Sequence, residues 1–319
     1  MGGDSSLFVN SRPALVLGGG GALGVAQAAY ALAAFELGFE PKIMVGTSVG
    51  SLNGAWLATN PGNPEGLLRV WLQLDRMKLL QVNPLRLARN LARGQMGIST
   101  NDLIPKLIAR YVGDADFDEA AMPLAIVATN LTRGQKHVFR SGRLAPAIRA
   151  STAIPGIFEP VRIGDDVFVD GCLTASVDLL TAVEMGATEI LAIDLTPLPS
   201  RTKPRTVVGV LKQSFGILTH ATTDAMERSV AMQVPVRVVR PALAASSPWR
   251  LDDSAGAIAH NLLLARAHIG GVLDAHGHVV AGWAWDAAEA APPEPAAAAD
   301  DPALLSRDRF FRPSRRQAS

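Results

Sequence analysis

Short apolar runs alternate with helical patterns along most of the chain. The first such pair is a strand-like run at 14–17 and a helix from 25 to 36. The other predicted strands lie at 42–45, 166–169, 190–195 and 236–239, and the other predicted helices at 51–58, 176–185, 207–232 and 256–273. Strands that alternate with helices predict an α/β fold with a mainly parallel central sheet flanked by helices in three layers.

Composition divides the chain into three parts. With 319 residues, 48% of them hydrophobic, the chain is long enough for one large domain, which we expect over 13–284. Within it, a helical insertion or cap is predicted at about 60–115. Residues 1–12 are expected to be flexible. Residues 285–319 are rich in alanine, proline and charge, so this tail is expected to be disordered.

Charge and cysteine usage exclude several classes of protein. The balance of 30 basic against 29 acidic residues argues against a nucleic-acid partner. The one cysteine excludes an intrachain disulfide framework and fits a reducing compartment. No signal peptide is expected, because residues 1–12 lack a cationic start and an apolar core, and no apolar run has the ~20 residues of a membrane span. The sequence therefore predicts a cytoplasmic protein.

Local charge is less even than the total. Residues 69–93 hold six basic residues and one acid, interleaved with apolar side chains. Such a stretch suits an amphipathic helix that rests on an anionic bilayer, but an ordinary solvated helix is the favoured interpretation because such helices are more common. The five arginines of 307–316 are a second candidate for peripheral membrane contact.

The pentapeptide Gly46-Thr47-Ser48-Val49-Gly50 lies at the turn from a predicted strand into a predicted helix. A G-x-S-x-G sequence at such a turn is typical of a nucleophile elbow. Its small residues permit a tight turn that projects the serine hydroxyl, and the helix amino terminus favours developing negative charge. The alternative is a small-residue turn into a packed helix.

Upstream, the loop 18–24 reads Gly-Gly-Gly-Gly-Ala-Leu-Gly and follows the first predicted strand. Its backbone amides at a helix start suit an anion, either a dinucleotide pyrophosphate or the oxyanion of acyl transfer. The spacing Gly19-x-Gly21-x-x-Gly24 matches the dinucleotide fingerprint, but that fingerprint expects an acid at the end of the second strand. Glu40 precedes that strand and Ser48 follows it, so the oxyanion reading is favoured over a nucleotide-binding oxidoreductase.

A serine nucleophile needs a base. Six histidines are candidates, but none has a distinctive context: His137, His220, His260, His268, His276 and His278. Asp170 follows the strand-like run 166–169 and precedes Gly171, which places a carboxylate at a strand end. Such a carboxylate can take the serine proton directly if its surroundings raise its basicity. A turn aspartate before glycine is an equally good interpretation of the residues alone.

Four blocks in this order resemble the patatin-like phospholipases, compact bacterial members in particular, over about 13–195. They are the glycine loop 18–24, the elbow 46–50, Ala150-Ser151-Thr152-Ala153-Ile154-Pro155-Gly156-Ile157-Phe158-Glu159-Pro160, and Asp170-Gly171. The resemblance implies lipid ester substrates, no metal or organic cofactor, and a dyad of Ser48 as nucleophile and Asp170 as base. It implies amides of Gly19, Gly20 and Gly21 as oxyanion donors, with motif glycines at Gly24, Gly46, Gly50 and Gly171.

Two positions depart from that family pattern. Leu23 stands where the family usually has Arg or Lys, and Cys172 stands where it usually has Gly or Ala. A missing cation would weaken the hold on a phosphate head group or remove a contact that braces the loop. If position 172 requires a positive φ, a side chain there would be strained. A weakened, lipid-binding or regulatory member of the family is therefore the alternative to an active serine hydrolase.

Overall fold

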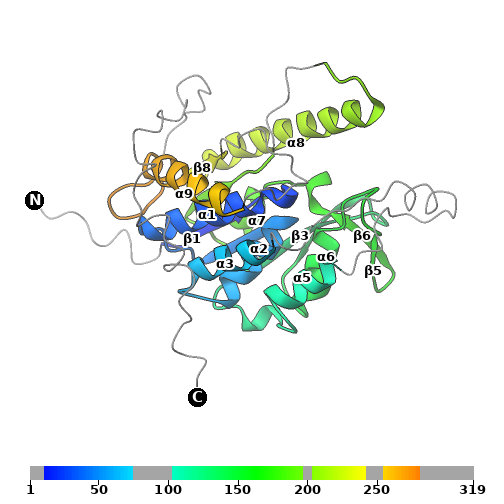
Figure 1. Ribbon diagram of the computed structural model, residues 1–319, viewed down its shortest axis with the longest axis horizontal. Helices are drawn as coiled ribbons and strands as arrows, with labels where there is room; N and C mark the ends of the chain where they lie inside the picture. The colour runs from blue at the N-terminus through cyan, green and yellow to red at the C-terminus, as the bar shows by residue number, and fades with distance from the viewer. Residues whose placement is uncertain (1–10, 75–102, 197–202, 242–253, 281–319) are drawn as a thin grey trace, which may run out of the picture.

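The computed structural model describes residues 11–74, 103–196, 203–241 and 254–280, which form a mixed sheet between two layers of helices (Figure 1). The strands run in the order β5-β6-β3-β2-β1-β7-β8, and β4 pairs with β3. Their bounds are β1 Pro13–Leu17, β2 Ile43–Thr47, β3 Leu124–Asn130, β4 Gln135–Phe139, β5 Val161–Ile163, β6 Asp166–Asp170, β7 Glu189–Ile193 and β8 Val236–Val239.

The centre of the sheet is parallel and one side is antiparallel. β1 pairs in parallel with β2 and β7, β2 pairs in parallel with β3, and β7 with β8. β6 runs antiparallel to both β3 and β5, and β4 runs antiparallel to β3. The predicted, mainly parallel sheet is confirmed. The alternating pattern did not predict the antiparallel side, since hairpins leave no helix between their strands.

Most of the described helices lie in the connections between the parallel strands. Their bounds are α1 Gly24–Glu36, α2 Val49–Thr59, α3 Pro64–Leu74, α5 Leu103–Tyr111, α6 Leu144–Ser151, α7 Leu179–Glu184, α8 Val207–Ala231 and α9 Ser254–Gly270, with 3-10 turns at Gly21–Leu23, Phe117–Glu119 and Gly171–Leu173. The helix predicted from 176 begins at Leu179, because the Asp178 side chain caps it by accepting from the Thr181 amide.

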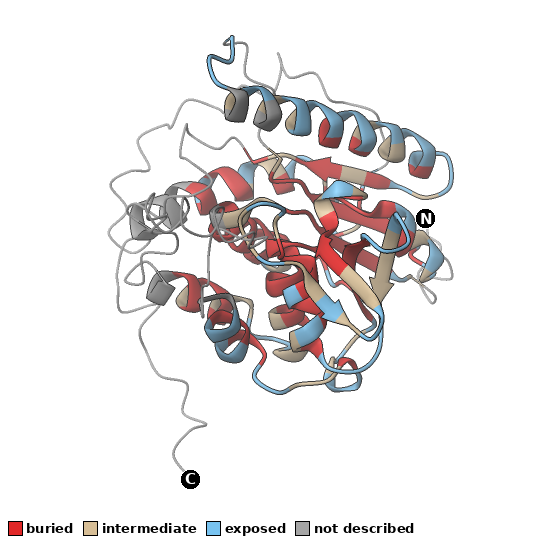
Figure 2. Cartoon of the chain, turned by 90° about the vertical axis from the view of Figure 1, so that its right-hand side faces the viewer, coloured by how far each residue is buried: buried red, intermediate tan, exposed pale blue. Residues whose placement is uncertain are grey.

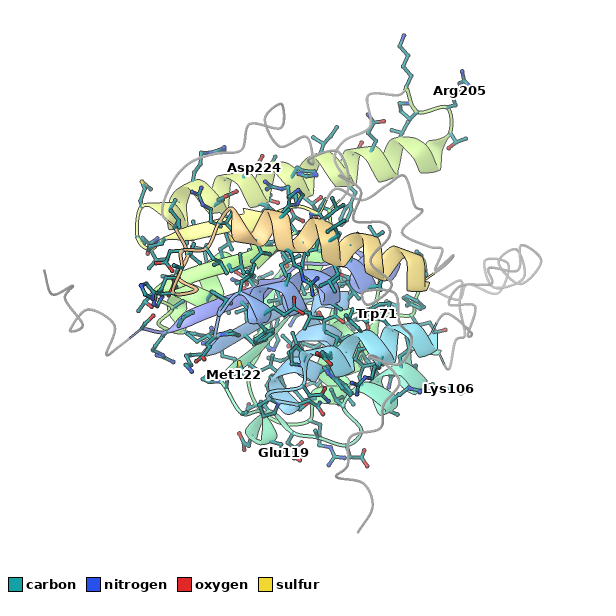
Figure 3. The ribbon with its side chains drawn as sticks, turned by 60° about the vertical axis from the view of Figure 1, so that its left-hand side comes forward. Trp71, Lys106, Glu119, Met122, Arg205 and Asp224 are labelled. Carbon is teal, nitrogen blue, oxygen red and sulfur yellow. The ribbon has the colours of Figure 1, made fainter. Side chains whose placement is uncertain are left out.

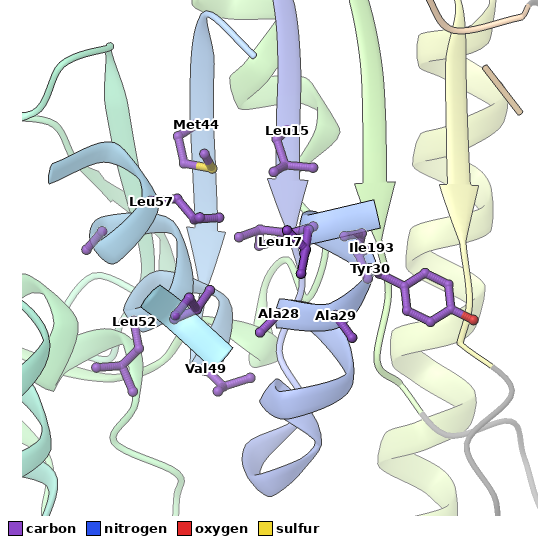
Figure 4. Packing of buried hydrophobic residues seen from close by; sticks show 14 of the residues in the cluster. Leu15, Leu17, Ala28, Ala29, Tyr30, Met44, Val49, Leu52, Leu57 and Ile193 are labelled. Atoms are coloured by element: carbon purple, nitrogen blue, oxygen red, sulfur yellow. The ribbon is translucent and has the colours of Figure 1, made fainter. Parts of the chain in front are cut away.

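Alternate residues of each strand face opposite layers. Leu15 and Leu17 of β1 belong to a buried cluster with α1 and α2, as Figure 4 shows. Ala14 and Val16 belong to a second cluster on the other face, with residues of α7 and α8. Both faces of a central strand are apolar, as burial between two helical layers requires. The three-layer α/β/α fold is therefore confirmed.

Parts of the predicted organisation fall outside the described residues. These parts are residues 1–10 of the amino-terminal segment, residues 75–102 of the predicted insertion, and the tail. Of the basic stretch 69–93, only the end of α3 is described, and there Val70 and Trp71 are buried against the protein (Figure 3). No helix within the described residues is long and apolar enough to cross a membrane.

Candidate active site

Ser48 occupies the turn between β2 and α2. Its backbone has φ 55° and ψ −125°, and it is the one non-glycine residue with positive φ in the described part of the chain. Such a conformation costs about 1–3 kcal/mol and persists only where the surrounding structure imposes it. The elbow predicted from the sequence is therefore formed, and its strain falls on the residue that carries the hydroxyl.

Close backbone approach explains the glycines on either side of Ser48. A Cβ added at Gly46 would overlap the carbonyl oxygen of Gly50. A Cβ added at Gly50 would overlap the carbonyl oxygen of Leu17, at the end of β1. Strand, elbow and helix therefore approach more closely than any side chain would allow.

The register of β3 brings Asp170 to this turn. Thr47 pairs with Val127, and the next residue of β3, Ala128, pairs with Asp170 at the end of β6. The Ser48 hydroxyl donates a hydrogen bond of 2.6 Å to Oδ2 of Asp170, across 122 residues of sequence. This length is typical of a hydroxyl that donates to a charged carboxylate. The predicted nucleophile and base are thus in direct contact.

The surroundings of Asp170 suit a proton acceptor. Ser48 is 4% and Asp170 3% exposed. Burial raises the pKa of Asp170 above the ordinary value, against the smaller opposing effect of hydrogen bonds from the Ser48 hydroxyl and from the amide and thiol of Cys172. That amide donates to Oδ1 at 2.9 Å, so both carboxylate oxygens are held. A carboxylate made more basic and fixed in direction can accept the serine proton.

The glycine loop lies against the same serine. A Cβ added at Gly19 would lie 3.1 Å from Cβ of Ser48 and would overlap Sγ of Cys172. The Gly19 amide donates to the Ser176 carbonyl at 3.2 Å. Gly20 and Gly21 follow at the 3-10 turn that leads into α1. The loop, the nucleophile and Cys172 therefore meet at one point, and the Gly19 amide already has an acceptor there.

A buried chain of amide side chains braces both ends of this loop. Gln27 Nε2 donates to the Gly18 carbonyl at 2.9 Å, and Asn53 Nδ2 donates to the Gly24 carbonyl at 3.0 Å. Asn53 also donates to Gln27 Oε1 at 3.0 Å and accepts from Trp71 Nε1 at 2.9 Å. Sequence reasoning missed these residues, although a single amide within each apolar helix was an available signal.

Ser151 holds the elbow from the side of β3. The Ser48 backbone amide donates to Ser151 Oγ at 2.8 Å, and that hydroxyl donates to the Val127 carbonyl at 2.6 Å. Ser151 was predicted only as part of the block 150–160 and not as a site residue. Its position shows why a small hydroxyl residue is needed there: it links the turn to the central sheet.

Comparison with known proteins identifies the family to which the chain belongs. A family model described as patatin-like phospholipase matches residues 15–183, which include the glycine loop, Ser48 and Asp170. The chain belongs to the patatin-like phospholipase family. Members of this family are lipid acyl hydrolases. The resemblance inferred from four motif blocks is confirmed.

Individual relatives of this patatin-like chain are much longer than it is. Patatin-like phospholipase domain-containing protein 7 of Mus musculus is 28% identical over 191 residues, 59% of this chain and 14% of the relative. Lysophospholipase nte1 of Aspergillus terreus is also 28% identical, over 59% of this chain and 12% of the relative. The chain thus spans about an eighth of these curated relatives. Among solved structures, VipD from Legionella pneumophila matches with a TM-score of 0.41 and 13% identity, covering 81% of this chain and 67% of VipD.

The two departures from the patatin-like pattern are both accommodated. Leu23 is buried in the apolar cluster beside α1, so this position faces the protein core here. Cys172 lies in a 3-10 turn and is not among the residues with positive φ, so the strain considered for it is absent. The other motif glycines are also sites of close packing, Gly24 against Trp71 and Gly171 against the Val127 carbonyl.

Three of the described histidines have partners other than Ser48 in this patatin-like domain. His268 shares a hydrogen bond of 2.8 Å with the Tyr30 hydroxyl, and His278 pairs with Glu189 at 2.7 Å. The His137 ring packs against Phe139 in β4. These contacts are structural, whereas the Ser48 hydroxyl is directed at Asp170.

Proposed function

We propose that this protein is a serine acyl hydrolase of lipid esters, acting through Ser48 and Asp170. The 2.6 Å hydrogen bond between their side chains is the observation that carries the proposal. Membership of the patatin-like phospholipase family supports lipid esters as the substrate class. It also favours a hydrolase over a nucleotide-binding oxidoreductase, which would leave the elbow and Asp170 without a role.

In the proposed reaction, Ser48 Oγ attacks the ester carbonyl carbon while its proton passes to Oδ2 of Asp170. The negative charge on the former carbonyl oxygen is stabilised by amides of the glycine loop. Because the Gly19 amide donates to Ser176, the proposal assigns this task to Gly20 and Gly21. The leaving alkoxide takes the proton from Asp170 as the carbon–oxygen bond breaks, which leaves an acyl-enzyme.

The second half of the reaction repeats these steps with water. Asp170 accepts a proton from a water molecule whose oxygen attacks the acyl carbon, and the same amides stabilise the second oxyanion. Collapse of this intermediate breaks the bond to Ser48 Oγ, which recovers its proton from Asp170. The products are a fatty acid and the alcohol part of the lipid. Besides the lipid ester and this water molecule, the steps use only groups of the chain.

A fluorophosphonate probe tests the proposal directly. We expect the probe to modify the full-length protein once, at the peptide that contains Ser48, and to leave the Ser48→Ala variant unmodified. Hydrolysis of a panel of lysophospholipid, diacyl phospholipid and acylglycerol esters would then define the substrate. Absence of labelling and of hydrolysis in the folded wild-type protein would overturn the proposal in favour of a lipid-binding or regulatory role.

A further inference from the structure

Helix α8 starts at the same edge of the sheet as the candidate site. It follows β7, whose last residue, Ile193, accepts a hydrogen bond from the Gly18 amide in the glycine loop. The helix has 25 residues and is therefore roughly 37 Å long. The strands on either side of it, β7 and β8, have five and four residues, at most about 17 Å. One end of α8 must extend beyond the sheet.

The end that extends is the amino-terminal one. From Thr219 onwards α8 has buried side chains, including Thr223 and Val230, which cover the sheet. None of the described side chains at 209–218 is buried. Figure 3 shows Arg205 at the outer end of this helix, far from Asp224 near the body of the protein. The amino-terminal half of α8 therefore projects from the edge at which Ser48 lies.

This projecting half has an apolar outer face. Val210, Phe215, Ile217 and Leu218 are 48%, 40%, 51% and 53% exposed. Ile217 and Leu218 lie two helical turns after Val210, and Phe215 lies one turn before Leu218, so the four residues form one broad apolar stripe. Figure 2 shows the corresponding outward side of α8 as largely exposed. Single exposed apolar residues are ordinary, but a continuous stripe of bulky ones marks a contact surface.

The charges around the stripe indicate what it contacts. Lys203 and Arg205 are exposed immediately before the helix, and the sequence from 203 to 223 has no acidic residue. The first acid, Asp224, is half-buried and pairs with Arg240 at 2.7 Å. Bulky apolar side chains beside a cationic, acid-free helix start are complementary to an anionic bilayer, which offers both hydrocarbon and negative head groups.

We propose that residues 203–218 form a membrane-binding surface, which we call the α8 face. It inserts Val210, Phe215, Ile217 and Leu218 into an anionic bilayer and places Lys203 and Arg205 among the head groups. The contact would hold the sheet edge that carries Ser48 toward the lipid. This inference concerns binding, goes beyond the proposed hydrolysis, and differs from the contacts predicted for 69–93 and for the tail.

Vesicle co-sedimentation with the full-length protein tests the α8 face. Ether-linked lipids contain no carboxylic ester bond, so their use separates binding from hydrolysis, and a failure of one proposal does not affect the other. We expect binding to vesicles of phosphatidylcholine mixed with phosphatidylglycerol, and at least about tenfold weaker binding to phosphatidylcholine alone. Equal binding to both, or binding to neither, would overturn the proposal.

Two double variants and a matched control locate the contact. Ile217→Ser with Leu218→Ser should weaken binding to anionic vesicles about tenfold or more. A matched pair elsewhere, Leu131→Ser with Leu263→Ser, also replaces exposed leucines and should change binding less than about twofold. Lys203→Gln with Arg205→Gln should weaken binding to anionic vesicles by about tenfold or more, and leave the weak binding to neutral vesicles unchanged.

Circular dichroism and sedimentation velocity accompany these measurements. The substituted side chains are exposed, so thermal unfolding should be unchanged, and Leu218→Ser alone provides a milder variant if the double one unfolds. Vesicle binding of the 217/218 variant equal to that of wild type would contradict the proposal. A wild-type dimer that becomes a monomer in this variant, with vesicle binding retained, would assign the face to a second copy of the chain instead.

Discussion

Helices α2 and α8 both follow a parallel strand and begin at the same edge of the sheet, but they differ in the burial of their apolar residues. All but two of the eleven residues of α2 are buried, and its first turn is set by the strained backbone of Ser48. The first half of α8 exposes its bulkiest apolar residues instead. A helix start at this edge of the sheet is therefore enclosed by protein in α2 and exposed in α8.

The difference lies in what each helix start contacts. The start of α2 is enclosed by backbone groups of β1, by Ser151 and by Asp170, which leave no freedom for the serine. The described start of α8 extends past the sheet, where we propose that a bilayer takes the place of a protein partner. Fixed geometry suits a reacting group, whereas an exposed apolar face suits reversible contact.

Substitution of Ser48, before α2, should affect ester hydrolysis far more than a substitution in the exposed half of α8. Ser48→Ala removes the nucleophile and should lower kcat for ester hydrolysis by at least about 10³-fold. Ser214→Ala on the exposed face of α8 should leave hydrolysis of a soluble short-chain ester within about twofold. Initial rates of the purified proteins, with circular dichroism as the check on folding, measure both. Retention of a tenth of the activity by folded Ser48→Ala would contradict the proposed nucleophile.

Substitution of Asp170 tests the base. Asp170→Asn keeps the shape and can still accept from the Cys172 amide, but it cannot take the serine proton. We expect kcat to fall at least about 100-fold. Asp166→Asn, at the half-buried start of the same strand, removes the charge that pairs with the exposed Arg133 and should have little effect on kcat. If His220→Ala abolished activity while Asp170→Asn did not, a histidine-based mechanism would replace the dyad.

The raised pKa of Asp170 predicts opposite effects of pH on activity and stability. The carboxylate must be charged to accept a proton, so kcat/KM should fall as pH decreases through a pKa above the ordinary value of 3.8. The folded state holds this proton more tightly than the unfolded chain does. The contribution of Asp170 to the free energy of unfolding should therefore decrease as pH rises from the ordinary pKa to the raised pKa of the folded protein. Rate profiles and urea unfolding of wild type and Asp170→Asn measure both; a wild-type profile with no acid limb above the ordinary value would contradict the assignment.

A glycine substitution compares the packing of helix ends. Gly50→Ala, in the first turn of α2, would place a methyl group on the Leu17 carbonyl and should destabilise the protein by about 2–3 kcal/mol. Gly270→Ala, at the end of α9, would meet no atom within 4 Å and should change stability by less than about 0.5 kcal/mol. Urea unfolding of both variants checks the contrast. Equal free energies of unfolding for the two variants would contradict this prediction, because they would mean that the backbone of the elbow shifts to accommodate the methyl group.

These contrasts also show what the sequence could predict. The elbow, Asp170 and the glycine loop were predictable because each is a local pattern of residues at a strand end. The helix predicted at 207–232 was also nearly correct in its bounds. Its apolar stripe was not assignable to an inner or outer side, since periodicity gives the width of a face and not its direction. Likewise, no local pattern indicated which carbonyl groups would accept hydrogen bonds from Gln27 and Asn53.

Substitution of Cys172 should give the smallest effect near Ser48. Its amide donates to Oδ1 of Asp170 at 2.9 Å, so Cys172→Gly keeps that bond, both dyad residues and the loop amides, and removes only the weaker contribution of the thiol to Asp170. The thiol packs over Gly19, so its loss opens a small space there. We expect kcat for a short-chain ester to stay within about tenfold of wild type, about 1.4 kcal/mol of barrier. Cys172→Ala is the control that removes the sulfur without adding backbone freedom. A loss beyond about 100-fold in both variants would mean that the thiol itself positions Asp170, and a loss confined to Cys172→Gly would assign the effect to the backbone of the turn.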